Sequence, residues 1–414
     1  MLLEFMVKNF LSFEDAASLN MAGYGERIHP HHMVKGKGGN DVNLLRGALI
    51  YGANASGKSN LVKALAFVKD FVTRGREKSE PIGYTPYKFS HPDTWTRFEI
   101  AVKTKGNIYR YEITLLHGRV LIETLSRSGA HTERLIYKRT TNEEGIAELE
   151  LGSRFAKLTK KEKQFITFVA RGTRPNVLFL TESVERNVKV FDFMVDWFTD
   201  SLLIVTPNDK PTNLGAQLVA NPDLARFVNK FIGAADTGIS RLNVEPVPGT
   251  DPGQHPGETR YHLTTQHRSQ LGHTEHTFEL DEESDGTKRL IDLLPAYYKL
   301  TTTPELVVVI DEMGRNLHPE LIAYLCEWYF DINPNPVSQL IFTTHHPSLM
   351  DLSRLRRGEI WFCEKAPDGA TELYSLLEFG NTRYDKDVQT AYRQGRYGAV
   401  PRPAQVVDWG KDVV

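Results

Sequence analysis

The segment that most constrains this chain is GANASGKS, residues 52–59, which fits the pattern G-x-x-x-x-G-K-S. The apolar run ALIY precedes it, and the segment SNLVKALAFVKDFV that follows has apolar residues at helical spacing. Glycines let backbone amides point at phosphate oxygens, and the helix directs its positive N-terminus at them. In this pattern Lys58 reaches the β- and γ-phosphates and the hydroxyl of Ser59 ligates Mg²⁺. The sequence therefore predicts a strand, a phosphate-binding loop and a helix.

Two later apolar runs end in residues that can act on a bound phosphate. LVVVIDE ends in Asp311 and Glu312, and QLIFTTH ends in His345. Because the carboxyl ends of parallel strands meet at the ligand crevice, we expect Asp311 to hold the Mg²⁺ shell and Glu312 to polarise the attacking water as general base. His345 is expected to touch the γ-phosphate. Each pattern alone is also typical of plain surface residues, and the phosphate-binding loop favours the catalytic interpretation.

A fourth segment, DEESDGTKRLIDLLPA, begins a helix with Ser284, Asp285 and Gly286. Free amides and a hydroxyl collect at such a helix start, which makes it either a simple N-cap or a phosphate contact. Its position 27 residues before Asp311 favours the phosphate contact.

Hydrophobic periodicity predicts an α/β core interrupted by a mixed α+β insertion. Strands and helices alternate over residues 281–378, which indicates a largely parallel sheet covered by helices, and residues 1–80 supply the rest of this core. The insertion, residues 81–280, begins as a meander of antiparallel strands and continues with helices over 155–235 and strands at RLNVEPV and TRYHLTTQHR. Residues 379–414 form a C-terminal tail.

Composition excludes several classes of protein. Fifty basic residues against 52 acids argue against a protein that is basic all over, such as one that coats DNA. The two cysteines, Cys326 and Cys363, are too few for a disulfide framework or a zinc site and fit a reducing cytoplasm. The N-terminus does not resemble a signal peptide, and the purest apolar run, residues 306–310, is far too short to span a bilayer, so no membrane role is expected.

The four motifs occur in the order found in the ATP-binding-cassette class of P-loop ATPases, which this chain resembles. GANASGKSN is similar to the form of the SMC, Rad50, RecF and OLD branch, and FMVKNFLSFEDAASLNM looks like the first hairpin of that branch. More narrowly, the chain resembles the Rlo-type AAA-like ATPases of prokaryotic anti-phage and abortive-infection loci. The stretches that carry this resemblance are ESDGTKRLIDLLPA, VVVIDEMGRNLHPEL, QLIFTTHHPSLMD and YDKDVQTAYRQGRYGAVP.

The resemblance implies an ABC-type ATPase head that uses ATP and Mg²⁺ as a switch or sensor in phage defence. Two copies would sandwich two ATP molecules head to tail, as a homodimer or a higher homo-oligomer. One protomer would contribute the nucleotide-site residues Asn54, Gly57, Lys58, Ser59, Asn60, Asp311, Glu312 and His345. The other protomer would contribute Ser284 and Gly286 across the interface. Arg315 stands where relatives carry small residues, and it would either clamp phosphate across the interface or lie on the surface.

Several interpretations stay open. In the resembled group a tail like this one accompanies a separately encoded, nuclease-like effector, but the tail would equally pack on its own core. The stretch of residues 154–176 has seven basic residues and one acid, so it is either a nucleic-acid surface or a solvated helix face. His262, His267, His273 and His276 cluster in sequence, although the spacing of the last two places them on opposite faces of a strand and disfavours metal. The alternative function is a RecF- or Rad50-like ATPase of DNA repair or maintenance.

Overall fold

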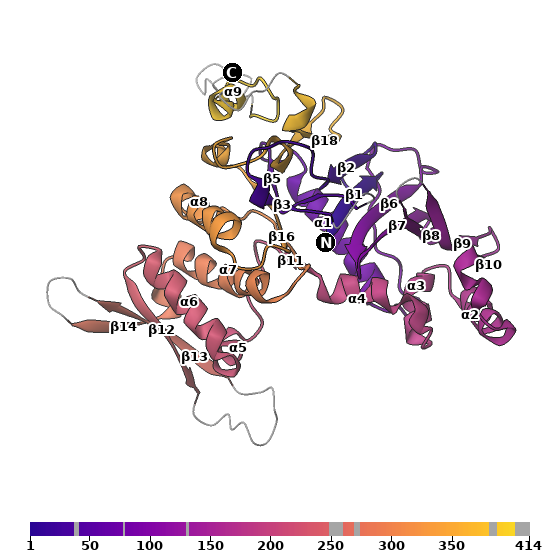
Figure 1. Cartoon of the computed structure of the whole chain (residues 1–414), viewed down its shortest axis with the longest axis horizontal. Helices are drawn as coiled ribbons and strands as arrows, with labels where there is room; N and C mark the ends of the chain where they lie inside the picture. Colours follow the sequence, from indigo (N-terminus) through magenta and orange to yellow (C-terminus); the bar gives the residue numbers. More distant parts are fainter. Residues whose placement is uncertain are drawn as a thin grey trace, which may run out of the picture.

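The structure is a computed structural model that describes residues 1–36, 41–77, 79–129, 132–247, 260–268, 274–380 and 387–401. His273 and Tyr384, from two of the patterns above, lie outside these residues. Two large sheets dominate the described chain, and a small third sheet extends from one end (Figure 1).

The core sheet has six strands in the order β11-β15-β16-β5-β17-β18. These strands are β5 (Gly47–Tyr51), β11 (Leu202–Val205), β15 (Val307–Ile310), β16 (Gln339–Thr344), β17 (Ile360–Lys365) and β18 (Thr371–Ser375). All neighbours pair in parallel except β17 and β18. Strands β5, β15 and β16 are buried along their whole length, as their uninterrupted apolar runs predict. Their carboxyl ends therefore lie side by side at one edge of the sheet.

The second sheet is antiparallel and has the order β10-β9-β8-β7-β6-β1-β2. Its strands are β1 (Leu2–Lys8), β2 (Ala17–Asn20), β6 (Thr96–Thr104), β7 (Asn107–Leu116), β8 (Arg119–Ser128), β9 (Glu133–Thr141) and β10 (Ala147–Leu151). The meander of antiparallel strands expected after residue 80 is confirmed as β6–β10. A further short pair, β3 (Met33–Val34) and β4 (Leu44–Leu45), lies beside the first hairpin.

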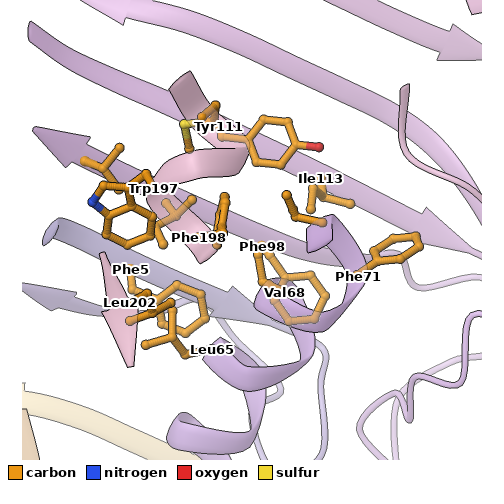
Figure 2. Close-up of a cluster of buried hydrophobic side chains, with 14 of the residues drawn as sticks. Phe5, Leu65, Val68, Phe71, Phe98, Tyr111, Ile113, Trp197, Phe198 and Leu202 are labelled. Atoms are coloured by element: carbon orange, nitrogen blue, oxygen red, sulfur yellow. The ribbon is translucent and has the colours of Figure 1, made fainter. Parts of the chain in front are cut away.

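Helix α1 (Lys58–Thr73) joins the two sheets through a shared apolar core. Figure 2 shows Leu65 and Val68 of α1 beside Phe5 and Phe98 of the antiparallel sheet, with Trp197 of helix α4 (Asp192–Asp200) nearby. One face of the core sheet contributes its alternate residues to this cluster. Helix α1, which follows the phosphate loop, is therefore packed against both large sheets.

The other face of the core sheet packs against a second apolar cluster. Helices α5 (Leu214–Ala220), α6 (Pro222–Ala234), α7 (Asp285–Thr302) and α8 (Pro319–Glu327) contribute to it. Beyond them lies the small antiparallel sheet of β12 (Ile239–Pro246), β13 (Tyr261–Arg268) and β14 (Glu275–Glu279), which extends to one side in Figure 1. The remaining helices are α2 (Lys160–Gly172), α3 (Phe179–Glu185) and α9 (Val388–Arg393).

Both large sheets combine strands from the segment 81–280 with strands from the rest of the chain. Strand β6 pairs with β1, so the meander continues the N-terminal hairpin. Strand β11, expected as the end of a helix, pairs in parallel with β15 and extends the core sheet. The sequence did not show this, because hydrophobic periodicity reports a strand but not the sheet that it joins. The described tail, residues 387–401, packs on the core through Tyr392 and Tyr397, whose rings stack on Phe362.

Candidate functional site

The glycine-rich segment forms a tight loop between β5 and α1, as the sequence predicts. Gly57 has a φ of 106°, in the left-handed region that favours glycine. A Cβ at Gly57 would lie 2.0 Å from Oγ1 of Thr371, so the loop has no room for a larger residue there. Lys58 is buried, and its Nζ donates to the carbonyl oxygens of Gly52 at 2.7 Å and Ala53 at 2.9 Å. Lys58 is therefore held against the concave side of the loop.

A chain of hydroxyl contacts anchors the loop from outside. Oγ1 of Thr371, at the start of β18, lies 2.9 Å from the carbonyl oxygen of Ser56 and 2.7 Å from Oγ of Ser12. Nδ2 of Asn60 donates to the same Ser12 hydroxyl at 2.8 Å. Ser12 lies in the turn between β1 and β2, so Asn60 ties helix α1 to the N-terminal hairpin. Ser12 lies in the stretch that resembles the first hairpin of the SMC, Rad50, RecF and OLD branch, but the sequence did not predict its contact with Asn60. Thr371 was missed because it lies in no recognisable motif.

The two acids after β15 are positioned by a threonine of the neighbouring strand. Thr343 of β16 donates from its hydroxyl to Oδ1 of Asp311 at 2.6 Å and accepts from the backbone N–H of Glu312 at 2.7 Å. Asp311 is only 5% exposed. Glu312 has a φ of 48°, which is uncommon for a residue with a Cβ. Such strain persists only where the surroundings over-determine it, and it is concentrated at functional sites.

Lys58, the acid pair and His345 share one electrostatic environment. Burial lowers the pKa of Lys58 below its ordinary value, while Glu312 and Asp311 oppose that shift. Partial burial and the charge of Lys58 together lower the pKa of His345, which favours the neutral imidazole near pH 7. The structure thus brings together Lys58, Asp311, Glu312 and His345 from three neighbouring strand ends.

A cavity of about 1010 Å³ opens over the phosphate loop. Gly52, Asn54 and His345 line one side of it. Residues of the tail, including Tyr392 and Arg393, line another. The docked tail is therefore part of the wall of the candidate nucleotide site.

Ser284 and Gly286 lie outside this cavity. Ser284 is the N-cap of α7, and its hydroxyl accepts from the N–H of Thr287 at 3.1 Å. A Cβ at Gly286 would lie 2.5 Å from the carbonyl oxygen of Asn316, in the segment that follows Glu312. The start of α7 therefore packs on the segment after the acid pair, and it does not line the phosphate-loop cavity of its own chain.

Two arginines lie near the start of α7. Arg315 is exposed, and its Nη1 donates to Oδ1 of Asn208 at 2.9 Å. Arg289, one turn into α7, is 5% exposed, and its Nε and Nη2 have no hydrogen-bond partner among the described residues. Arg289 was not predicted as a site residue, because a basic residue on an amphipathic helix is ordinarily solvated.

The residues present fit ATP with Mg²⁺. The hydroxyl of Ser56 in the phosphate loop is buried with no hydrogen-bond partner in the described structure, so it is free to bind a phosphate oxygen. Ser59 and Asp311 offer a hydroxyl and a carboxylate, which are oxygen donors of the kind that Mg²⁺ prefers.

A family model described as "AAA domain, putative AbiEii toxin, Type IV TA system" matches residues 48–351. The chain belongs to this family. The match spans the phosphate loop, the acid pair and His345, so the AAA-domain family and the six-stranded sheet together show an ABC-type P-loop ATPase fold, and the expected α/β class is confirmed. No curated protein sequence matches the chain.

Three solved structures, all of SMC heads, are similar to the chain. An SMC head bound to the C-winged helix domain of ScpA is 13% identical with a TM-score of 0.48, covering 90% of this chain and 97% of that one. The head from Thermotoga maritima is 15% identical, with a TM-score of 0.40 and coverage of 90% and 98%. An SMC head bound to the C-terminal domain of ScpA derived from Pyrococcus furiosus is 13% identical, with a TM-score of 0.42 and coverage of 92% and 97%. No shared activity follows at these identities.

The remaining sequence patterns lie in the small antiparallel sheet and in helix α2. His262 contacts Glu279, and Nε2 of His267 lies 2.6 Å from Oε1 of Glu283, so these two histidines pair with carboxylates rather than with each other. The basic stretch includes helix α2, where Phe168 is 73% exposed. No helix among the described residues is both long and apolar enough to cross a bilayer.

Proposed function

We propose that this protein is an ATP-driven switch, in which two copies bind two ATP molecules head to tail and separate after hydrolysis. One observation carries the proposal. The loop lysine and the acid pair are electrostatically coupled to His345, which lines the cavity over the phosphate loop, whereas Ser284 and Gly286 at the start of α7 do not line that cavity. A helix N-terminus stabilises a phosphate only where it faces it, so a second copy supplies what the cavity of one chain lacks.

Each residue has a distinct role in this proposal. Lys58 neutralises the β- and γ-phosphates, and the loop amides bind the same oxygens. Glu312 accepts a proton from the attacking water, and Thr343 orients both acids through its two hydrogen bonds. His345 in its neutral form donates a hydrogen bond to the γ-phosphate. Ser59 and Asp311 would hold Mg²⁺, which would neutralise part of the phosphate charge.

The decisive experiment measures mass by size-exclusion chromatography with light scattering on Glu312→Gln, with and without ATP and Mg²⁺. This variant lacks the general base but keeps Lys58, so it should bind ATP without hydrolysing it. The ATP-bound dimer should therefore accumulate. Lys58→Ala is the matched control, and it should remain at its nucleotide-free mass. An assembly of Glu312→Gln that is the same with and without nucleotide would show that ATP does not create it. A parental hydrolysis rate in Glu312→Gln would remove Glu312 as the base.

We further propose that the switch acts in phage defence with a separately encoded, nuclease-like effector. The family description, which names an AbiEii toxin, supports this setting. The test is the efficiency of phage plating on cells that carry the protein with its neighbouring genes. Protection should be lost in Lys58→Ala, and unchanged protection in that variant would separate defence from ATP binding.

One observation favours a second candidate, an ATPase that acts on nucleic acid. Lys160, Lys163 and Arg171 of α2 surround a surface hollow together with the exposed ring of Phe168. Basic groups follow a phosphate backbone, and an exposed ring can stack on a base. ATP-dependent binding of bare DNA that weakens with salt and is lost in Lys163→Glu would support this function. Equal DNA binding by Lys163→Glu and by the parent would exclude this face of α2 as the DNA-binding surface.

A further inference from the structure

Three histidines lie together on a segment far from the phosphate loop. His29, His31 and His32 each offer one ring nitrogen, and these three atoms lie within 4.8 Å of one another. The segment PHH, residues 30–32, is a short 3-10 turn that His29 directly precedes, and the ring centroids of His29 and His32 lie 5.0 Å apart. We propose that these three histidines bind a divalent transition metal ion, with Zn²⁺ as the occupant.

The backbone of this segment is rigidly held. Arg356 is fully buried and donates to four carbonyl oxygens of the segment 24–29, including that of His29 at 3.2 Å. Arg46, also buried, donates to the carbonyl oxygen of His31 at 3.0 Å. His29 has a φ of 48°, a conformation that a non-glycine residue keeps only when its surroundings enforce it. The three rings are therefore preorganised, as a metal site requires.

Carboxylates orient two of the three rings. Nδ1 of His32 lies 3.0 Å from both carboxylate oxygens of the buried Glu359, and the His32 ring stacks on Phe330. Nε2 of His31 lies 2.8 Å from Oδ1 of Asp331. Each pairing engages one ring nitrogen and leaves the other for an ion. A carboxylate on the far nitrogen of a ligating histidine is the usual outer partner of a bound metal, and it fixes the tautomer.

Ligand chemistry and access favour zinc. Imidazole nitrogen suits Zn²⁺ and its first-row neighbours, whereas Mg²⁺ and Ca²⁺ prefer oxygen. His29 and His32 line a cavity of about 400 Å³, so an ion can reach these two rings. The site would fasten the segment 29–32 to residues 328–332, which follow α8, and to Glu359, which precedes β17.

The experiment uses the full chain without an affinity tag, stripped with EDTA and then titrated with Zn²⁺ against a chromophoric competitor and with Co²⁺ alone. We expect about one ion per chain, with visible Co²⁺ absorption typical of tetrahedral coordination. His31→Ala should weaken Zn²⁺ binding by more than about tenfold, because it removes a ligand, and Asp331→Asn by about tenfold, because it removes an outer partner. His31 is exposed, so this variant should keep its fold, which the melting temperature in EDTA checks.

Two controls separate this site from others. His276→Ala, an exposed histidine on β14, should bind Zn²⁺ like the parent. Lys58→Ala should also bind it like the parent, because the inference does not depend on ATP. Absence of stoichiometric Zn²⁺ binding, or equal binding in His31→Ala and the parent, would overturn the proposal and leave the histidines as a hydrogen-bonded cluster.

Discussion

At the scale of single residues, the backbone strain at Glu312 can be measured separately from the catalytic role of its carboxylate. An L-residue in the left-handed region costs about 1–2 kcal/mol, and Glu312 has a φ of 48°. We expect Glu312→Gly to be more stable than Glu312→Ala by about 1 kcal/mol, since both lose the carboxylate and only glycine relieves the strain. Urea denaturation measures the difference. Equal stabilities, or a more stable alanine variant, would show that the backbone there is not strained.

The two cysteines give a second prediction at this scale. Burial raises the pKa of the Cys326 thiol and of the Cys363 thiol to about 12. Below that pH both remain protonated, and the thiolate is the reactive form. Native protein at pH 8 should therefore react very slowly with a thiol reagent, whereas protein in urea should react fully at both positions. Rapid labelling of native protein would show that at least one of the two thiols is accessible.

At the scale of elements, one buried acid joins the antiparallel sheet to the helical region. Glu123 of β8 is fully buried, and it accepts hydrogen bonds from Tyr111 and Tyr137 and from the first N–H groups of α3. Its carboxylate also lies 3.6 Å from Nη1 of the buried Arg139. The acid thus stabilises the start of a helix and a buried guanidinium at the same time.

Removal of this carboxylate should be costly. Glu123→Ala leaves Arg139 buried and uncompensated, and we expect a loss of about 3–5 kcal/mol in the free energy of unfolding. Glu148→Ala, at an exposed position of β10, is the matched control and should change stability by less than about 0.5 kcal/mol. The comparison requires denaturant melts under identical conditions. A similar small effect in both variants would mean that the buried network contributes little.

The same scale shows what the sequence could predict. The strands β5, β15 and β16 were predicted because their burial on both faces requires uninterrupted apolar runs, and the motifs at their ends identified Lys58, Asp311 and His345. No strand bounds were predicted for β14, because all its residues are exposed and it has no apolar face to reveal it. The anchor Thr371 was missed for a different reason. It reaches the loop from a strand more than three hundred residues away, which no local pattern reports.

At the scale of the whole molecule, the described tail, residues 387–401, forms part of the wall of the cavity over the phosphate loop. Ring stacking on Phe362 and the hydrogen bond from the Tyr374 hydroxyl to the carbonyl oxygen of Tyr397 hold the tail in place. Gly398 has no room for a side chain, since a Cβ there would lie 2.2 Å from Oε2 of Glu364. Self-packing does not exclude an effector, because a partner that binds the tail would reach the wall of the nucleotide cavity directly.

This arrangement predicts that ATP affinity depends on the tail. Arg393 lines the cavity, whereas Arg396, three residues later, does not. A hydrogen bond between charged groups is worth about 1.5–3 kcal/mol, so Arg393→Ala should weaken ATP binding by about tenfold or more. Arg396→Ala has the same change in charge and should bind ATP like the parent, as isothermal titration on the Glu312→Gln background would show. Equal affinities in the two variants would mean that the tail covers the site without contacting the nucleotide, and weakening in both would point to net charge rather than to contact.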